Sequence, residues 1–443
     1  MTDAAQTRLP RRNRGLLSAA DASNIEIDTP DQVNTFLLAG TLGVGGFVGR
    51  DGGVDVVRLR AALSERLTGP SLDLARFSQR IEADGRHLSW VPSEPDMATH
   101  VRVLQPVDGP EGLEALCATL MTVPLPRDRP LWEFLVVPGA TADGPGIVLR
   151  VHHAVADGVA GVRLVQRLFG ADLPAPPPPG LTSEPRQAGR GPRRRRPLPG
   201  DVRRAARSVA TSVSRVAAVF RATVPPTVLL GRIGARRGVA FTDVDLASLA
   251  RSARQEGATV NDALLAAVSA AVAATLLADN QPVPPVLPAS VPVALPDRGS
   301  SGNAVGVMLV PLPTGEADAG VRLARIAALT RSAKAEARAQ GTYELTRTRW
   351  GSRLFAWLAR RQRFVALFVT NVRGPDRPLL VAGAPLVRAW PLAPIQGNVR
   401  LGVAAMSYAG RLSVAVHTDV DAIDAAGLRN ALARELATLS ERP

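Results

Sequence analysis

The sequence predicts a mixed α/β (α+β) chain in two parts, each combining strands with helices. The chain has 443 residues, long for one hydrophobic core, and 46% of them are hydrophobic, enough for a substantial core. Residues 171–200 form a break that is too rich in proline, glycine and arginine to build a packed core. We therefore expect an N-terminal subdomain over residues 1–170, a crossover over 171–240 and a C-terminal subdomain over 241–443.

The N-terminal part is expected to contain a strand hairpin followed directly by a helix. Residues 131–137 and 146–153 are apolar and joined by a turn-rich segment, which is typical of two adjacent strands. Residues 158–170 show apolar side chains at helical spacing and end near a glycine, which indicates an amphipathic helix.

The crossover combines the break with a basic segment. Over residues 201–222, apolar side chains recur at helical spacing and arginines occupy the other face. Such a helix can lie on a membrane surface, or it can pack on its own protein as an ordinary surface helix, which is the more common case.

The C-terminal part is expected to combine two helices with at least four strands. Residues 263–278 are apolar and rich in alanine but too short to cross a bilayer comfortably, so we expect a buried core helix within 261–278. A second, amphipathic helix is expected over 425–439. The expected strands, all apolar and rich in β-branched residues, are 288–295, 304–313, 363–372 and 411–419.

Composition narrows the classes of function. The formal net charge is +14, but Lys334 is the single lysine among 53 basic residues, so the charge reflects an arginine-rich composition more than a nucleic-acid surface. Aromatic residues make up 4% of the chain, which leaves few stacking platforms for single strands. The single cysteine, Cys117, excludes an internal disulfide and a cysteine-based zinc cluster. We expect no nucleic-acid partner and, from the N-terminal residues, no secretory signal.

The most informative segment ends the second strand of the hairpin, where two of only five histidines, His152 and His153, stand side by side. Asp157 and Gly158 follow after three small residues, where Asp157 can cap the next helix and Gly158 permits close backbone approach. A neutral imidazole at such a turn can take a proton from a hydroxyl, amine or thiol.

Two other interpretations of the histidine pair are weaker. A shared metal is disfavoured, because adjacent side chains on a strand point to opposite faces and no other histidine has a familiar ligand spacing. Both histidines could instead be ordinary core residues, but the small residues and the Asp-Gly exit that follow them disfavour a purely structural role.

Twin histidines, three spacers and Asp-Gly resemble the HHxxxDG signature of the CoA-dependent acyltransferase superfamily, which includes chloramphenicol acetyltransferases and peptide-synthetase condensation domains. Upstream, Pro130, Leu131 and Trp132 resemble the PLW segment of the bacterial wax ester synthase/diacylglycerol acyltransferase family. From the residues alone, these three predict a proline-bounded strand with a buried tryptophan, and a structural role is the more common one.

Two downstream segments resemble the same family. Asn261 and Asp262 match its ND segment at a helix start, where either residue can cap the helix and where the resemblance implies a position near the catalytic centre. Asn371, Gly374 and Pro375 match its NVPGP block, although from the residues alone they are turn residues beside a core strand.

The chain also departs from the family pattern. Val33 and Asn34 stand where the family has a Met-His pair, Arg373 replaces a proline of the NVPGP block, and Pro296 stands where an arginine is common. These changes leave His153 untouched but bear on which acceptor the protein uses.

The resemblance implies a chloramphenicol-acetyltransferase-like fold, with two pseudo-related mixed-sheet subdomains and an active-site channel between them. It implies transfer of a fatty acyl group from acyl-CoA to diacylglycerol or a long-chain alcohol, with His153 as the general base. Asp157 would fix the loop that aims His153, His152 would be more structural than catalytic, and Asn261 and Gly158 would contact substrate. No metal or cofactor is expected besides acyl-CoA as substrate.

Two alternatives remain. One is an acyltransferase of the same superfamily that acts on a different hydroxyl or on an amine. The other is a catalytically weak, lipid-binding homologue. In either case we expect a cytoplasmic protein that can attach peripherally to the inner membrane face or to a lipid-droplet surface.

Overall fold

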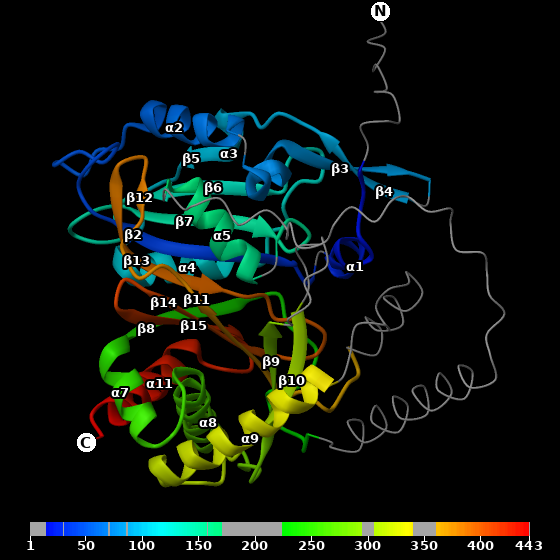
Figure 1. The fold of residues 1–443 in the computed structure, drawn as a ribbon, viewed down its shortest axis with the longest axis vertical. Coiled ribbons are helices and arrows are strands. Elements are labelled where there is room, and N and C mark those ends of the chain that lie inside the picture. Colours follow the sequence, from blue (N-terminus) through cyan, green and yellow to red (C-terminus); the bar gives the residue numbers. More distant parts are fainter. Residues whose placement is uncertain are drawn as a thin grey trace, which may run out of the picture.

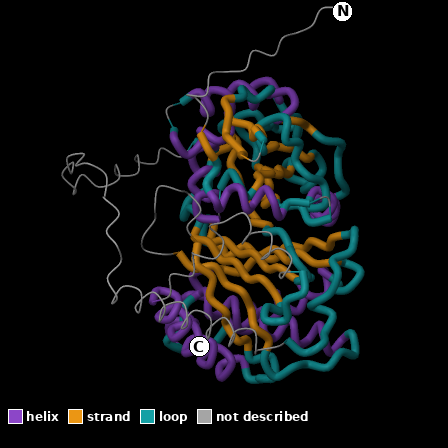
Figure 2. The backbone as a smooth tube through the Cα atoms, turned by 90° about the vertical axis from the view of Figure 1, so that its right-hand side faces the viewer, coloured by secondary structure: helices purple, strands orange, loops and turns teal. Residues whose placement is uncertain are grey.

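The computed structural model describes residues 15–29, 31–69, 71–85, 87–156, 158–170, 224–294, 305–339 and 360–442. Asp157, Pro296 and the helix expected over 201–222 lie outside these residues. Within them, two six-stranded sheets form the centres of two halves that lie one above the other in Figure 1. In the view turned by 90°, helices flank these strand-rich regions (Figure 2). The predicted α+β chain with a sheet in each half is confirmed.

The sheet of the N-terminal half has the strand order β12-β13-β2-β7-β6-β5. Its strands are β2 (Thr35–Leu42), β5 (Val101–Val103), β6 (Trp132–Val137), β7 (Gly146–His152), β12 (Leu380–Val381) and β13 (Ala384–Leu392). The expected hairpin is present as the antiparallel pair β6 and β7. A small third sheet contains β1 (Gly15–Leu16), β4 (His87–Pro92) and β3 (Gln79–Asp84).

Two strands of this sheet come from the far end of the chain. β13 pairs antiparallel with β2, so residues 380–392 complete the N-terminal sheet although they lie within the C-terminal range 241–443. The Tyr408 hydroxyl of the other half anchors the exchanged hairpin, because it donates to the Leu386 carbonyl at 2.7 Å and accepts from the Leu379 N–H at 2.9 Å. The two halves are therefore joined by strand exchange as well as by the crossover.

The sheet of the C-terminal half has the order β10-β9-β11-β14-β15-β8. Its strands are β8 (Arg237–Asp245), β9 (Leu287–Ala294), β10 (Val305–Leu312), β11 (Leu367–Arg373), β14 (Leu401–Tyr408) and β15 (Arg411–Asp419). All four strands expected in this part of the chain are present, and β8 was not assigned from the sequence.

Helices cover the sheets. In the N-terminal half they are α1 (Ala19–Ile27), α2 (Val56–Thr68), the 3₁₀ helix η2 (Leu72–Ser78), α3 (Met97–His100), α4 (Gly109–Leu120) and α5 (Gly158–Leu168). In the C-terminal half they are α7 (Leu246–Gln255), α8 (Val260–Ala278), α9 (Ala319–Ala339) and α11 (Ala425–Ser440).

Helix α8 is the expected alanine-rich helix. By length and apolar composition it is the one helix among the described residues that could cross a membrane. Most of its residues are buried in the C-terminal core beside α9 and α11, which agrees with the predicted core helix.

Alternating residues of β2 explain how the N-terminal sheet is buried on both faces. Leu38 belongs to a cluster with residues of α2 and α5, whereas Leu37 and Ala39 face α4 and the other half. On that second face, Phe241 of β8 stacks on Trp390 of β13, with ring centroids 4.8 Å apart. The two halves thus share one apolar cluster, which fixes their relative position.

Candidate active site

The histidine pair lies where β7 ends, with a neighbouring segment on each side. The His152 N–H donates to the Leu131 carbonyl at 3.1 Å, and the His153 N–H donates to the Asn34 carbonyl at 3.0 Å. The Val155 N–H then bonds back to the His152 carbonyl at 2.9 Å, which closes a tight turn. The strand therefore ends as expected, and both histidine backbones are fixed by hydrogen bonds.

The His152 side chain is buried and surrounded by other groups of the protein. Its side chain is 1% exposed, and its Nδ1 accepts the Ala154 N–H at 3.0 Å. Because Nδ1 is an acceptor here, we assign the ring proton to Nε2, which lies 3.4 Å from Oδ2 of Asp28. Both ring nitrogens thus face groups of the protein, as the predicted structural role of His152 requires.

Asp28 is the buried carboxylate behind the motif. Its Oδ1 accepts the Asn34 N–H at 2.9 Å and its Oδ2 accepts from Arg127 at 3.1 Å. Burial by itself would raise the pKa of Asp28, but His152, the Asn34 N–H and Arg127 outweigh burial and hold the pKa below its usual value. The carboxylate is therefore ionised and orients the ring of His152.

His153 has a different environment. Its side chain is partly exposed and lies against the edge of Phe36, with ring centroids 5.3 Å apart. Desolvation, with a smaller contribution from His152, lowers the pKa of His153 to about 4. With this pKa, the ring is uncharged at neutral pH. No described residue forms a hydrogen bond with the imidazole, so a ring nitrogen is free to accept a proton.

The helix that follows the motif meets the other half of the molecule. Gly158 begins α5, and a Cβ atom at this position would lie 3.4 Å from Cγ1 of Val372 in β11. The motif turn therefore lies at the junction of the two halves, beside the strand that also carries Asn371. Asp157 lies outside the described residues, so its predicted role stays a prediction.

The PLW residues support the histidines from within the core. The Trp132 ring is fully buried between Phe77 and His100, and its indole N–H donates to the Phe77 carbonyl at 3.0 Å. Leu131 supplies the carbonyl that holds His152, and the carbonyl of Pro130 accepts the Trp132 N–H at 3.0 Å. These contacts match the structural role expected for the segment.

The ND residues lie at the start of α8 in the C-terminal half. Asp262 forms a capping box with Thr259 and also accepts from the Thr330 hydroxyl at 2.6 Å. Asn261 is partly exposed on the first turn, and no hydrogen bond within the described residues links it to the histidine motif. Asp262 is thus a structural residue, and substrate contact by Asn261 stays a prediction.

The NVPGP residues shape the end of β11. The Gly374 N–H donates to the Ser407 carbonyl at 3.0 Å, and a Cβ atom at Gly374 would come within 2.4 Å of that oxygen, so the close approach requires glycine. The Pro375 carbonyl accepts the Ala409 N–H at 3.1 Å. Asn371 lies in β11 itself and is partly exposed.

The sequence did not identify Asp28, Arg127 or Asn24 as site residues. Asn24 donates to the His153 carbonyl at 3.3 Å, and Asp28 and Arg127 hold His152 and its surroundings. They are far from the motif in the chain, and no local pattern marks them. Asn34 drew attention only as a departure from the family pattern.

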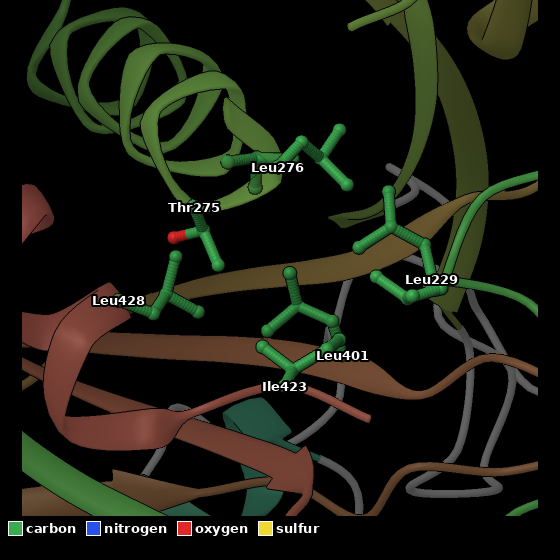
Figure 3. A pocket seen from close by; sticks show the side chains of 8 residues that line it. Leu229, Thr275, Leu276, Leu401, Ile423 and Leu428 are labelled. Atoms are coloured by element: carbon green, nitrogen blue, oxygen red, sulfur yellow. The ribbon is translucent and has the colours of Figure 1, made fainter. Parts of the chain in front are cut away.

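Other candidate sites lie elsewhere or are absent from the described residues. In that part of the chain, no group of three or more His, Cys, Asp or Glu side chains could hold a metal ion. Figure 3 shows a cavity within the C-terminal core, lined by Val228, Leu229, Val272, Thr275, Leu276, Leu401, Ile423 and Leu428. Its lining is apolar except for the Thr275 hydroxyl, which already donates to the Ala271 carbonyl at 2.9 Å. None of these residues belongs to the half that holds His153, so we interpret the cavity as a packing gap.

Comparison with known proteins agrees with the geometry. The wax ester synthase/diacylglycerol acyltransferase catalytic domain matches residues 17–264, and the C-terminal domain of the same family matches residues 301–440. A Mycobacterium tuberculosis protein named as a diacylglycerol O-acyltransferase (Rv1760) is 30% identical over 436 residues, which cover 90% of this chain and 85% of that protein.

Solved structures show the same fold. The wax ester synthase/diacylglycerol acyltransferase from Marinobacter aquaeolei VT8 superposes with a TM-score of 0.71 at 22% identity, covering 96% of this chain and 98% of that one. A trichothecene 15-O-acetyltransferase from Fusarium sporotrichioides gives 0.65 at 8% identity, covering 98% of this chain and 96% of that one. The predicted acyltransferase fold is confirmed.

Proposed function

Because the chain belongs to the wax ester synthase/diacylglycerol acyltransferase family and is an O-acyltransferase, we propose that it transfers a fatty acyl group from acyl-CoA with His153 as general base. The observation that carries this proposal is the state of His153. Its imidazole is uncharged and partly exposed, and its backbone is held at both the N–H and the carbonyl.

The proposed reaction needs one proton acceptor at this position. The free imidazole nitrogen of His153 takes the proton of the acceptor hydroxyl. The oxygen of that hydroxyl attacks the thioester carbonyl at the same time. The new C–O bond forms, the C–S bond breaks, and the proton passes to the leaving CoA thiolate, so that His153 returns to its neutral state. General base catalysis contributes about 10²–10⁴-fold, and positioning of two bound substrates contributes more.

The contacts of His152 support His153, and not His152, as the base. One ring nitrogen accepts the Ala154 N–H and the other faces the ionised Asp28, so neither is open to an acceptor hydroxyl. Because the pKa of His153 is lowered to about 4, its ring is neutral at neutral pH and can accept a proton. The motif turn lies near the contact of α5 with β11, between the two halves, where the family fold implies the channel.

The acceptor we propose is diacylglycerol or a long-chain alcohol. The name of the Mycobacterium tuberculosis relative supports diacylglycerol, and that of the Marinobacter protein supports both acceptors. Purified protein should be incubated with one acyl-CoA and an equimolar mixture of diacylglycerol, hexadecanol and a long-chain amine. Mass spectrometry should find triacylglycerol or wax ester; an amide as the main product would overturn the proposed acceptor.

The same assay separates catalysis from lipid binding alone. Release of CoA thiol should depend on an acceptor and on His153. A protein that binds the lipids but releases no thiol with any of the three acceptors would be a non-catalytic homologue.

Since both proposed substrates are amphipathic or apolar, we also propose a cytoplasmic protein that attaches peripherally to the inner membrane face or to lipid droplets. Sedimentation with anionic vesicles should recover the protein in the pellet at low salt and less of it at high salt. Recovery only in the supernatant under both conditions would contradict a peripheral attachment.

A further inference from the structure

A relay of three amide side chains connects the C-terminal half to the turn that carries His153. The Gln396 Nε2 donates to Asn34 Oδ1 at 2.7 Å, and the Asn34 Nδ2 donates to Asn24 Oδ1 at 3.2 Å. The Asn24 Nδ2 then donates to the His153 carbonyl at 3.3 Å. Each amide donates to the next group in the same direction, an arrangement in which hydrogen bonds strengthen one another.

Asn34 is the centre of this relay. Its side chain is 2% exposed, and its Nδ2 also donates to the Asn24 carbonyl at 2.9 Å. Its backbone carbonyl accepts the His153 N–H at 3.0 Å, so side chain and main chain of one residue both act on the same histidine. These contacts need one acceptor and two donors on a single side chain. The amide of Asn34 supplies them, whereas the neutral imidazole of the histidine found here in the family does not.

The first member of the relay belongs to the other half. Gln396 lies in the segment between β13 and β14, which also meets Gln32 through two hydrogen bonds. The Gln32 Nε2 donates to the Gly397 carbonyl at 2.8 Å, and its Oε1 accepts the Gly397 N–H at 2.9 Å. The segment before β2 is therefore clamped to the C-terminal half at two neighbouring points.

We propose that Gln396 and Asn34 are positioning residues. Through them, the relative position of the two halves determines the position of the turn that carries His153. The proposal rests on the proposed function of His153 as base. Neither residue is assigned a contact with substrate: Gln396 acts through Asn34, and Asn34 acts through Asn24 and through the His153 backbone. This gives Asn34, which departs from the family pattern, a specific role in this chain.

The test is Gln396→Met in the full-length protein. Methionine keeps the length of the side chain but cannot donate to Asn34, and Gln396 is only partly buried, so the variant should fold. We expect kcat to fall about 10- to 100-fold, because displacement of a catalytic group by about 1 Å from a remote change has effects of that size. The KM for acyl-CoA should stay within about twofold of the original.

The matched control is Thr418→Val. The buried Thr418 hydroxyl donates to the Ile423 carbonyl at 3.0 Å, entirely within the C-terminal half, so its loss removes one buried hydrogen bond without touching the relay. This variant should lower thermal stability while leaving kcat unchanged. An equal loss of kcat in both variants would overturn the positioning role, because general destabilisation would then account for it.

Amide hydrogen exchange supplies a readout that needs no activity. In Gln396→Met, but not in Thr418→Val, exchange should accelerate in the peptide that contains residues 150–156. Unchanged exchange and unchanged kcat in Gln396→Met would overturn the positioning role while the proposed reaction stands. If the wild-type protein shows no acyl transfer but exchange is still faster in Gln396→Met, the proposed reaction would be overturned. The coupling between the two halves and the His153 turn would then still stand.

Discussion

The Nε2 atom of His152 lies 3.4 Å from Oδ2 of Asp28, and this contact gives the two histidines of the motif different surroundings. It fixes His152 as a buried structural group whose ring proton faces a carboxylate. His153, one residue further along, keeps an imidazole that no described residue engages in a hydrogen bond. Two adjacent identical residues thus have different chemistry because only one of them meets Asp28.

Replacement of Asp28 should disturb this division. In Asp28→Asn, the amide N–H₂ must face either the Asn34 N–H or the side shared by Arg127 and His152, and all three groups are donors. We expect the free energy of unfolding to fall by about 1–3 kcal/mol. The kcat should fall with it, because the His152 ring loses the group that orients it. Urea unfolding followed by steady-state kinetics would check this, and wild-type values for both would contradict the role of Asp28.

The pH dependence of the reaction should reflect the unusual state of His153. Because its pKa is lowered from 6.5 to about 4, the ring stays neutral well below the usual range. The kcat/KM for the acceptor should be nearly constant on the acid side down to about pH 5 and then decline. Each sample should recover full activity on return to neutral pH, which excludes irreversible inactivation. A decline centred at the ordinary histidine pKa would contradict the assignment.

Acid should destabilise the folded protein through His417. Burial lowers the pKa of His417 to about 4, although its hydrogen bond to the Ala393 carbonyl opposes the shift. Since the unfolded chain binds this proton first, stability is complete above about pH 6.5 and is lost as the pH falls towards 4, by up to about 1.4 kcal/mol per unit. His417→Asn should reduce this slope in urea titrations between neutral and acid pH. An identical slope would show that another group is responsible.

The attachment of β12 and β13 to the N-terminal half should depend on the hydroxyl of Tyr408. Tyr408→Phe leaves the Leu386 carbonyl and the Leu379 N–H without their buried partner, which should cost about 1–3 kcal/mol of unfolding free energy. The midpoint of urea unfolding measures this cost. A midpoint equal to the wild type would mean that the exchanged hairpin is held by pairing with β2 alone.

Local patterns in the sequence were sufficient for most of the fold. The apolar runs that became β6, β7, β15 and α8 and the periodic segments that became α5 and α11 carry their own signals in the local sequence. The strand exchange could not be predicted in this way. The residues of β13 would be apolar in either sheet. Only the pairing of β13 with β2 shows that this strand belongs to the N-terminal sheet.

The site was predicted only as far as its local motif. His152, His153 and Gly158 lie close together in the sequence, so a strand, a turn and a helix could be expected around them. Asp28 and Gln396 reach the motif from distant positions in the chain, and a single buried carboxylate or amide has no sequence signature. Their roles depend on tertiary contacts.

The central claim is that His153 removes the acceptor proton, and His153→Gln tests it most directly. The variant should keep its fold, because the backbone hydrogen bonds of His153 with Asn34 and Asn24 do not use the imidazole. Thiol release from acyl-CoA in the presence of saturating diacylglycerol should be followed in both proteins. We expect the rate to fall by about 10²–10⁴-fold. Equal rates in the variant and the wild type would contradict catalysis by this imidazole.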